Sequence, residues 1–275
     1  MVLINKIRRR CKKWLKRMQK PVPVPVPVFQ NELLKGRRAL VTGGSSGIGL
    51  AMAKAFVRSG ASVIITGRDR DRLMHAANLI GDSKVVKVCV LDNTAPESFD
   101  QALLDCGVFD ILVNNAGYVG GSGFGNATVL EYDKVLDTNL RGPFFLSQAV
   151  ARQWIDNGIQ GNILNICSAS SLRPGNSPYI LSKWGMRSLT VGMAKKLIPH
   201  GIVVNGLAPG CTNTEKFCDD VREGIENSKN PAGRMVTVDE VANMAVVLVS
   251  SLARMVVGDV VYMTGGGAIT TFEDC

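Results

Sequence analysis

From Gly36 onward, short apolar runs alternate with stretches of helical pattern, and this alternation restricts the possible fold more than any other feature. The apolar runs are rich in Val, Ile and Leu, which is typical of strands buried on both faces. They lie at 39–42, 62–66, 85–91, 111–114, 162–167, 203–208 and 260–263. The helical stretches between them include 48–59, 70–80, 179–197 and 238–252. We therefore predict an α/β domain with a parallel sheet and helices on both faces.

The turn between the first apolar run and the first helical stretch is rich in glycine. It reads Thr42-Gly43-Gly44-Ser45-Ser46-Gly47-Ile48-Gly49, with the spacing G-x-x-x-G-x-G. Glycine lacks a Cβ atom, so the backbone can approach a pyrophosphate where the helix N-terminus offers free N–H groups. We expect Gly43, Ser45, Ser46, Gly47, Ile48 and Gly49 to bind a dinucleotide.

The ends of the second and third apolar runs indicate which dinucleotide binds. An acidic residue after the second strand holds the ribose 2′-hydroxyl of NAD, whereas an Arg suits the 2′-phosphate of NADP. Gly67 takes the place of the acid and Arg68 follows, so NADP(H) is favoured over NAD(H). Asp92 and Asn93, after the third run, are placed to meet the adenine. The alternatives are a solvated Arg68 and an ordinary turn aspartate at position 92.

Lys183 follows Tyr179 by four residues, in the run Tyr-Ile-Leu-Ser-Lys. On a helix these positions share a face, so the ammonium can lie beside the phenol and favour its ionised form. A phenol with a pKa near ~10 is a poor acid or base at neutral pH until that pKa is lowered. Many helices carry such a pair on a solvated face, but here Asn114–Gly117 (Asn-Asn-Ala-Gly) and Ser168 precede it, each at the end of an apolar run.

These motifs, in this order, resemble the short-chain dehydrogenase/reductase family in its single-domain branch. The resemblance covers about Gly36 to Gly267. It implies a Rossmann-like, doubly wound sheet of about seven strands in the order 3-2-1-4-5-6-7. Further matching motifs are Asn139 in Asp-Thr-Asn-Leu, Pro209-Gly210 with Thr214, Pro231-x-Gly-Arg234 and Gly265-Gly266.

The resemblance implies hydride transfer between a nicotinamide ring and a carbonyl or alcohol carbon. It makes Tyr179 the general acid in reduction and the base in oxidation, while Lys183 lowers the pKa of Tyr179 and holds the nicotinamide ribose. Ser168 would donate a hydrogen bond to the developing oxyanion, and Asn139 would help to hold a proton-relaying water. Further cofactor contacts are implied at Asn115, Ala116, Gly117, Tyr179, Lys183, Pro209, Gly210, Thr212 and Thr214.

The sequence departs from the family pattern at two places. Tyr179 follows Ser168 by 11 positions, and this spacing is two shorter than is common in the family. Ser170 or Ser171 could then be the catalytic serine, but only Ser168 directly follows the apolar run. Thr264 stands where the family usually has Asp, a change that we expect to affect packing and not chemistry.

The first 20 residues carry the whole net charge of +9. They hold nine of the 32 Lys/Arg and no acid, leaving 23 basic residues to balance 23 acidic ones. Within 3–18, all apolar side chains fall on one arc of a helix, a pattern typical of a helix lying in a membrane interface. A disordered tail, a mitochondrial presequence and a helix packed on the domain are the alternatives. Alternating Pro and Val at 21–28 favour polyproline II.

The expected organisation is therefore a basic head at 1–20, a Pro-Val spacer and linker at 21–35, and the dehydrogenase/reductase domain at 36–275. The balanced charge of the domain gives no basic face for nucleic acid. Seven scattered cysteines without a C-x-x-C pair predict neither disulfides nor a metal site, and indicate a cytoplasmic protein. The head would add peripheral contact with an anionic membrane surface. The chain also lacks an apolar run of ~18 residues that could span a membrane.

Three functional hypotheses remain. An NADP(H)-dependent carbonyl reductase or alcohol dehydrogenase is favoured, because a protein that only binds needs no complete set of Asn139, Ser168, Tyr179 and Lys183. A catalytically silent nucleotide-binding module and an interaction protein acting through its head are the alternatives. The substrate stays open between 3-oxoacyl-carrier-protein-reductase-like chemistry and sugars, steroids or secondary alcohols, because 216–231 mixes charges with little apolar surface. The resemblance also implies a homodimer or homotetramer.

Overall fold

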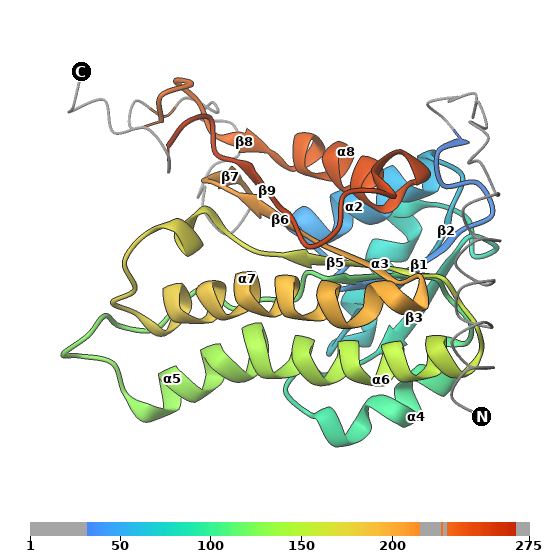
Figure 1. Cartoon of the computed structure of the whole chain (residues 1–275), viewed down its shortest axis with the longest axis horizontal. Helices are drawn as coiled ribbons and strands as arrows, with labels where there is room; N and C mark the ends of the chain where they lie inside the picture. The colour runs from blue at the N-terminus through green and yellow to red at the C-terminus, as the bar shows by residue number, and fades with distance from the viewer. Residues whose placement is uncertain (1–31, 215–226, 228–229, 268–275) are drawn as a thin grey trace, which may run out of the picture.

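The computed structural model of the chain describes residues 32–214, 227 and 230–267 (Figure 1). The predicted head at 1–20, the Pro-Val run at 21–28 and most of 216–231 lie outside the described residues. None of the described helices combines the length and the apolar character that crossing a membrane requires.

Seven parallel strands form one sheet in the order β3-β2-β1-β4-β5-β6-β9 (Figure 1). The strands are β1 (Arg38–Thr42), β2 (Ser62–Gly67), β3 (Val86–Val90), β4 (Ile111–Asn114), β5 (Asn162–Ile166), β6 (Val203–Pro209) and β9 (Val260–Met263). Ala39 of β1 pairs with Val63 on one side and with Ile111 on the other. The predicted sheet and its strand order are confirmed, with β9 as the seventh predicted strand.

Helices cover both faces of the sheet, as the alternating pattern predicted (Figure 1). They are α2 (Gly47–Arg58), α3 (Arg70–Ile80), α4 (Phe99–Cys106), α5 (Val129–Leu136), α6 (Gly142–Asp156), α7 (Pro178–Leu197) and α8 (Val238–Val249). α2, α3 and α8 share one buried apolar cluster with the sheet, and α4, α6 and α7 share another. Phe56 and Trp154 are the largest fully buried side chains of these two clusters. Burying one such side chain stabilises the fold by about 1.5–3 kcal/mol.

A second, two-stranded sheet lies outside the main one. It pairs β7 (Thr212–Asn213) with β8 (Val236–Thr237) in parallel. The sequence did not predict these strands, because two residues are too few to show an alternating pattern.

The main sheet changes its direction of winding between β1 and β4. β1 has β2 on one side and β4 on the other, so the connections that leave β1 and β4 diverge. In doubly wound sheets, ligands bind in the crevice that opens at the carboxyl ends of such strands. The glycine-rich turn follows β1 and Asn115–Gly117 follow β4, so both predicted motifs lie at this crevice.

Candidate active site

A cleft of about 640 Å³ opens at the carboxyl ends of β1 to β4. Most of the predicted cofactor positions line it, although they come from five separate segments of the chain. These are Gly43, Ser45, Ser46, Gly47, Ile48, Gly49, Arg68, Asp92, Asn93, Asn115, Ala116, Gly117 and Thr214.

The glycine-rich turn fits the cleft only because it lacks side chains. A Cβ atom on Gly49 would lie 2.3 Å from the carbonyl oxygen of Gly43. Gly43 itself has φ +63°, and a Cβ there would lie 3.0 Å from Cα of Ala116. Any side chain at these two positions would push the turn away from the loop after β4.

The N-terminus of α2 faces the same cleft. Ser46 is its N-cap, yet the Ser46 side chain makes no capping hydrogen bond, and the first turn contains no acid. The N–H groups of this turn and the positive end of the helix dipole are therefore free to bind an anion. This arrangement fits the pyrophosphate of a dinucleotide.

Thr42 and Asn115 join the two loops into one unit. The Thr42 hydroxyl donates to the carbonyl of Val113 (3.1 Å) and accepts the N–H groups of Asn115 and Ala116 (both 2.9 Å). The Asn115 amide donates to the carbonyls of Thr42 (2.8 Å) and Gly43 (3.2 Å). The Thr-Gly and Asn-Asn-Ala-Gly motifs therefore fix each other.

Two arginines lie at the β2 end of the cleft. Arg68 and Arg72 both line it and are exposed, and neither takes part in the ion pairs found among the described residues. Asp69 between them caps α3 by accepting the N–H of Arg72 (3.0 Å). Arg72 was not predicted as a site residue, although its spacing of four from Arg68 could have indicated it. Two unpaired guanidinium groups here suit a phosphate.

The β3 end of the cleft carries a buried donor without a partner. Asp92 accepts the N–H (2.9 Å) and hydroxyl (2.8 Å) of Thr94 through one carboxylate oxygen. Asn93 is only 6% exposed, and its Nδ2 has no hydrogen-bond partner in the described part of the chain. Leaving such a group unpaired costs about 1–3 kcal/mol. An acceptor on a bound ligand would satisfy it, so this end of the cleft also fits a dinucleotide.

Tyr179 and Lys183 lie in the first two turns of α7. The Lys183 ammonium is 5.8 Å from the centre of the Tyr179 ring and donates to the carbonyl of Ile166 (2.9 Å) at the end of β5. Lys183 is 7% exposed, and none of the ion pairs among the described residues includes it. An ammonium has three N–H donors, and the bond to Ile166 uses one of them. The other two can donate to the Tyr179 oxygen and to a ligand.

The structure distinguishes among the three serines after β5. Ser168 caps the short 3-10 helix η4 (Ala169–Leu172), where its hydroxyl accepts the Ser170 N–H (3.1 Å) and keeps its own proton to donate. Ser171 is fully buried, donates to the carbonyl of Ser168 (2.7 Å) and lies 3.2 Å from the Tyr262 hydroxyl. The hydroxyl of Ser171 is therefore used in packing.

The neighbouring Cys167 is also a packing residue, because burial raises the pKa of its thiol.

Asn139 connects the cleft to α7. It lies in a π-helical turn, η3 (Asp137–Arg141), and is 2% exposed. Its carboxamide accepts the N–H of Tyr118 (2.7 Å) and donates to the Tyr118 carbonyl (2.9 Å) and the Ser182 hydroxyl (3.1 Å). Ser182 in turn donates to the carbonyl of Tyr179 (2.7 Å). The whole side chain of Asn139 is used in holding Tyr118, a cleft residue, against the helix of Tyr179.

The predicted site residues thus form two groups along one edge of the sheet. Those that do not line the cleft are Asn139, Ser168, Tyr179, Lys183, Pro209, Gly210 and Thr212. Pro209 ends β6, Gly210 donates its N–H to Met263, and the Thr212 hydroxyl donates to Gly210 (3.0 Å). Apart from Asn139, which lies in η3 and contacts Tyr118, this group lies at or after the carboxyl ends of β5 and β6, next to the β1–β4 cleft in the sheet order.

Several cleft residues were not predicted. The Lys134 ammonium lies 4.3 Å from the centre of the Tyr118 ring, and both residues line the cleft. The others include Asp69, Leu91, Thr94, Leu130, Asp133, Asp137 and Thr138. Most belong to α5 and η3, and only tertiary packing brings them to the cleft, so no local sequence signal could have found them.

Comparison with known proteins places these motifs in one family. The family described as short chain dehydrogenase matches residues 37–223. The gluconate 5-dehydrogenase of Gluconobacter oxydans is 37% identical over 244 residues, which cover 85% of this chain and 95% of that protein.

Two solved structures show the same fold. A gluconate 5-dehydrogenase from Burkholderia cenocepacia, in complex with NADP and tartrate, is 32% identical with a TM-score of 0.77, covering 88% of this chain and 99% of that one. A 3-ketoacyl-(acyl-carrier-protein) reductase from Brucella melitensis, complexed with NADH, is 30% identical with a TM-score of 0.77, covering 86% and 100%. The family match and these relatives each extend over most of the chain. The protein therefore belongs to the short-chain dehydrogenase family of oxidoreductases that use a nicotinamide cofactor.

Proposed function

We propose that this protein transfers a hydride between NADP(H) and a ketone or secondary alcohol. The observation that carries the proposal is the buried ammonium of Lys183 beside the ring of Tyr179. Burying a cation that no carboxylate of the described residues pairs with is costly. That cost is explained if the ammonium also stabilises the ionised form of Tyr179 during proton transfer.

In this proposal Tyr179 moves the proton. Bound nicotinamide supplies or accepts the hydride, and the phenol of Tyr179 gives its proton to the carbonyl oxygen in reduction or takes it from the alcohol in oxidation. The Lys183 ammonium stabilises the phenolate electrostatically, while its hydrogen bond to Ile166 keeps the charge in place. A second donor of Lys183 would hold the nicotinamide ribose.

Ser168 and Asn139 support this transfer in different ways. The free hydroxyl proton of Ser168 would bind the oxygen on which charge develops. Because all carboxamide groups of Asn139 are already bonded, a relaying water would bind to its backbone carbonyl instead. The side chain of Asn139 would then act by fixing α7.

The cofactor preference is a proposal of its own. Arg68 and Arg72 at the β2 end of the cleft, with no acid at position 67, favour the 2′-phosphate of NADP(H). One similar structure holds NADP and another holds NADH, so the relatives do not decide between the two.

The substrate class is tested with a screen. Purified protein with NADPH should reduce members of a panel of ketones that includes keto-sugar acids and 3-oxoacyl thioesters, the compound classes named in the relatives. A chain that binds NADPH but oxidises it with no ketone would instead be the silent nucleotide-binding module.

We also propose a homodimer or homotetramer. α6 and α7 expose large apolar side chains, among them Phe144 (43%), Leu181 (44%) and Trp184 (40%). Exposed aromatic residues of this kind are enriched at protein interfaces. Light scattering at micromolar concentration should therefore give a multiple of the 29.5 kDa chain mass.

A pair of variants locates the interface. Phe144→Glu on α6 should shift the mass toward the monomer, because a buried charge would face an apolar partner surface. Met255→Glu, at a residue that is 92% exposed and outside these helices, serves as the control and should leave the mass unchanged. A wild-type monomer would contradict the proposal.

The head and its spacer carry a proposal about location. Nine basic residues in 1–20 can each contribute about 1 kcal/mol near an anionic leaflet. We expect the whole chain to co-sediment with anionic vesicles at low salt, and less so at high salt. A truncated chain beginning at Phe29 should keep its activity and lose vesicle binding. No co-sedimentation of the whole chain would show that the head has another role.

A further inference from the structure

Thr214 lines the cleft from the edge of the second, two-stranded sheet. It directly follows the two-residue strand β7 and lines the cleft opposite the start of α2. A Cβ atom on Gly47, the first residue of α2, would lie 3.7 Å from Cγ2 of Thr214. The position of Thr214 therefore sets the width of the cleft at the helix N-terminus.

β7 depends on β8 for its own position. Thr212 and Asn213 pair with Val236 and Thr237, and the N–H of Val236 donates to the carbonyl of Cys211 (2.9 Å). A two-stranded pair of this length is not stable alone in water. Something outside the pair must hold β8.

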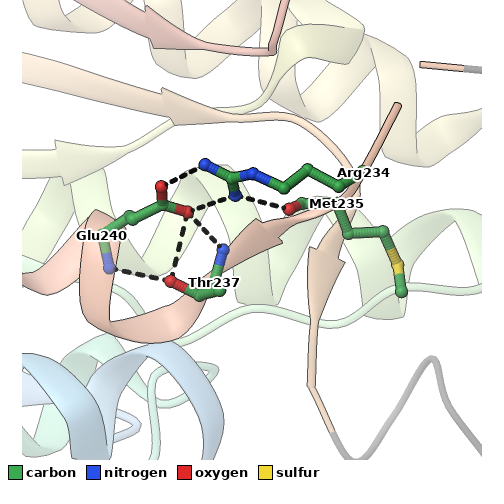
Figure 2. Close-up of polar contacts among 4 residues, drawn as sticks. All are labelled: Arg234, Met235, Thr237 and Glu240. Carbon is green, nitrogen blue, oxygen red and sulfur yellow. Dashed lines mark hydrogen bonds and ion pairs between the residues drawn. The ribbon is translucent and has the colours of Figure 1, made fainter. Parts of the chain in front are cut away.

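Arg234 and Glu240 hold β8 from both of its ends (Figure 2). The guanidinium donates to both carboxylate oxygens of Glu240 (2.8 and 2.6 Å) and to the carbonyl of Met235 (3.1 Å). We name this bidentate pair the Arg234–Glu240 clamp. Arg234 precedes β8 and Glu240 follows it, so the clamp closes a ring around the strand.

Thr237, the last residue of β8, completes the ring. Its N–H (2.9 Å) and hydroxyl (3.1 Å) donate to the Glu240 carboxylate, and its hydroxyl accepts the N–H of Glu240 (3.2 Å). This is a capping box, in which Thr237 is the N-cap of α8 (Figure 2). β8 is therefore joined rigidly to the start of α8.

α8 packs along α2, the helix whose N-terminus faces the cleft (Figure 1). Val241 and Ala245 of α8 share a buried cluster with Met52 and Ala55 of α2. The clamp thus connects β8 to the same packed pair of helices that positions the α2 N-terminus. Among the described residues, Thr214 is linked to this pair of helices through β7 and β8, and Val236 of β8 is buried in the same cluster.

The exposure and charge of the clamp indicate whether it acts on global stability or on local geometry. Its side chains are 44% and 39% exposed, and ion pairs at that exposure add little to global stability. The hydrogen bonds from Arg234, followed by those from Thr237, lower the pKa of Glu240 to about 2. The clamp is therefore charged at any pH used for assays, and it acts on local geometry more than on overall stability.

We propose that Arg234 and Glu240 are positioning residues for the cofactor, which hold β8, and through it β7 and Thr214, against the N-terminus of α2. The inference rests on the proposed function, because it assumes that NADP(H) binds at this cleft. It also assigns a role to Arg234 in the Pro231-x-Gly-Arg234 motif, which the sequence analysis left without one.

The first test measures cofactor affinity. In NADPH fluorescence titrations, Arg234→Gln should raise Kd about three- to fivefold, the modest effect of losing an exposed pair. Glu240→Gln should match it, Arg234→Lys should be intermediate, and the double variant should be no worse than either single one. With saturating cofactor, kcat should stay close to that of the wild type.

Asp239→Asn is the matched control. It removes a neighbouring acid from the first turn of α8 that lies 4.0 Å from Arg58 and is 72% exposed, without touching β8. Its Kd should equal that of the wild type. If Arg234→Gln bound NADPH as tightly as the wild type, the inference would be overturned. It would also be overturned if Asp239→Asn lost as much affinity for NADPH as Arg234→Gln.

The second test needs no cofactor. Amide hydrogen exchange of Val236, whose N–H bonds to Cys211, should be faster in Arg234→Gln than in the wild type and in Asp239→Asn. Unchanged exchange in Arg234→Gln would refute the clamp even if the affinity fell. A wild type that binds no NADPH would refute the proposed function, whereas this exchange experiment judges the clamp separately. If Arg234→Gln fails to fold, Arg234→Lys is measured in both tests against the same control.

Discussion

Tyr179→Phe should reduce kcat by about 10²–10⁴-fold, because the substitution removes the one hydroxyl that can exchange a proton with the substrate oxygen. The ring stays in place, so its contact with the Lys183 ammonium, 5.8 Å from the ring centre, is preserved. The Kd for NADPH should therefore change little. The measurement is steady-state reduction of a ketone found in the screen, together with a cofactor titration of the same variant.

The control for this variant is Tyr132→Phe. Tyr132 lies on α5, is 43% exposed and does not line the cleft, so removing its hydroxyl should leave kcat unchanged. If Tyr179→Phe kept wild-type activity, the assignment of Tyr179 as the proton donor would be wrong.

Arg68→Ala should remove most of the preference for NADPH over NADH. Hydrogen bonds to a charged group contribute about 1.5–3 kcal/mol, so kcat/KM for NADPH should fall about 10- to 100-fold while kcat/KM for NADH changes little. Arg72 also lines this end of the cleft, so Arg68→Ala with Arg72→Ala should lower the preference further.

Arg70→Ala is the control for cofactor choice. Arg70 is the first residue of α3, is exposed and lies outside the cleft lining. The substitution therefore removes one positive charge, as Arg68→Ala does, without removing a contact in the cleft. Equal efficiency of the wild type with both cofactors, or an unchanged preference in Arg68→Ala, would refute the role of Arg68.

The sequence predicted the main sheet well for a physical reason. Strands buried on both faces are nearly continuous in Val, Ile and Leu, and most helices between them, such as α2 and α8, have an apolar face, so these elements have a strong local signal. β7 and β8 have no such signal. Each is only two residues long, and their pairing joins Thr212 to Val236, which are far apart in the sequence.

The candidate site was predictable where the chemistry follows from residue type and position. The glycine-rich turn and the loop after β4 line the cleft as expected, since glycine tolerates the close approach seen at Gly43 and Gly49. Lys134 and Tyr118 were missed, because their pairing across the cleft depends on how α5 packs. Ser168 was chosen from its place directly after the apolar run, and the burial of Ser171 agrees with that choice.

The role of Asn139 was less predictable than its presence. Its motif indicated a polar function near Lys183, but not that every group of its side chain would be used on Tyr118 and Ser182. Such hydrogen bonds join residues 21 and 43 positions apart, and no local pattern encodes them.

The central claim, that the chain transfers a hydride between nicotinamide and a carbonyl carbon, is tested most directly with labelled cofactor. NADPH carrying deuterium at the transferable position of the ring is incubated with the wild type and a ketone from the screen, and the product is analysed by mass spectrometry. We predict an alcohol with deuterium on the former carbonyl carbon, formed about 10²–10⁴-fold more slowly when Tyr179→Phe replaces the wild type. NADPH that binds but passes no deuterium to any ketone of the panel would contradict the claim.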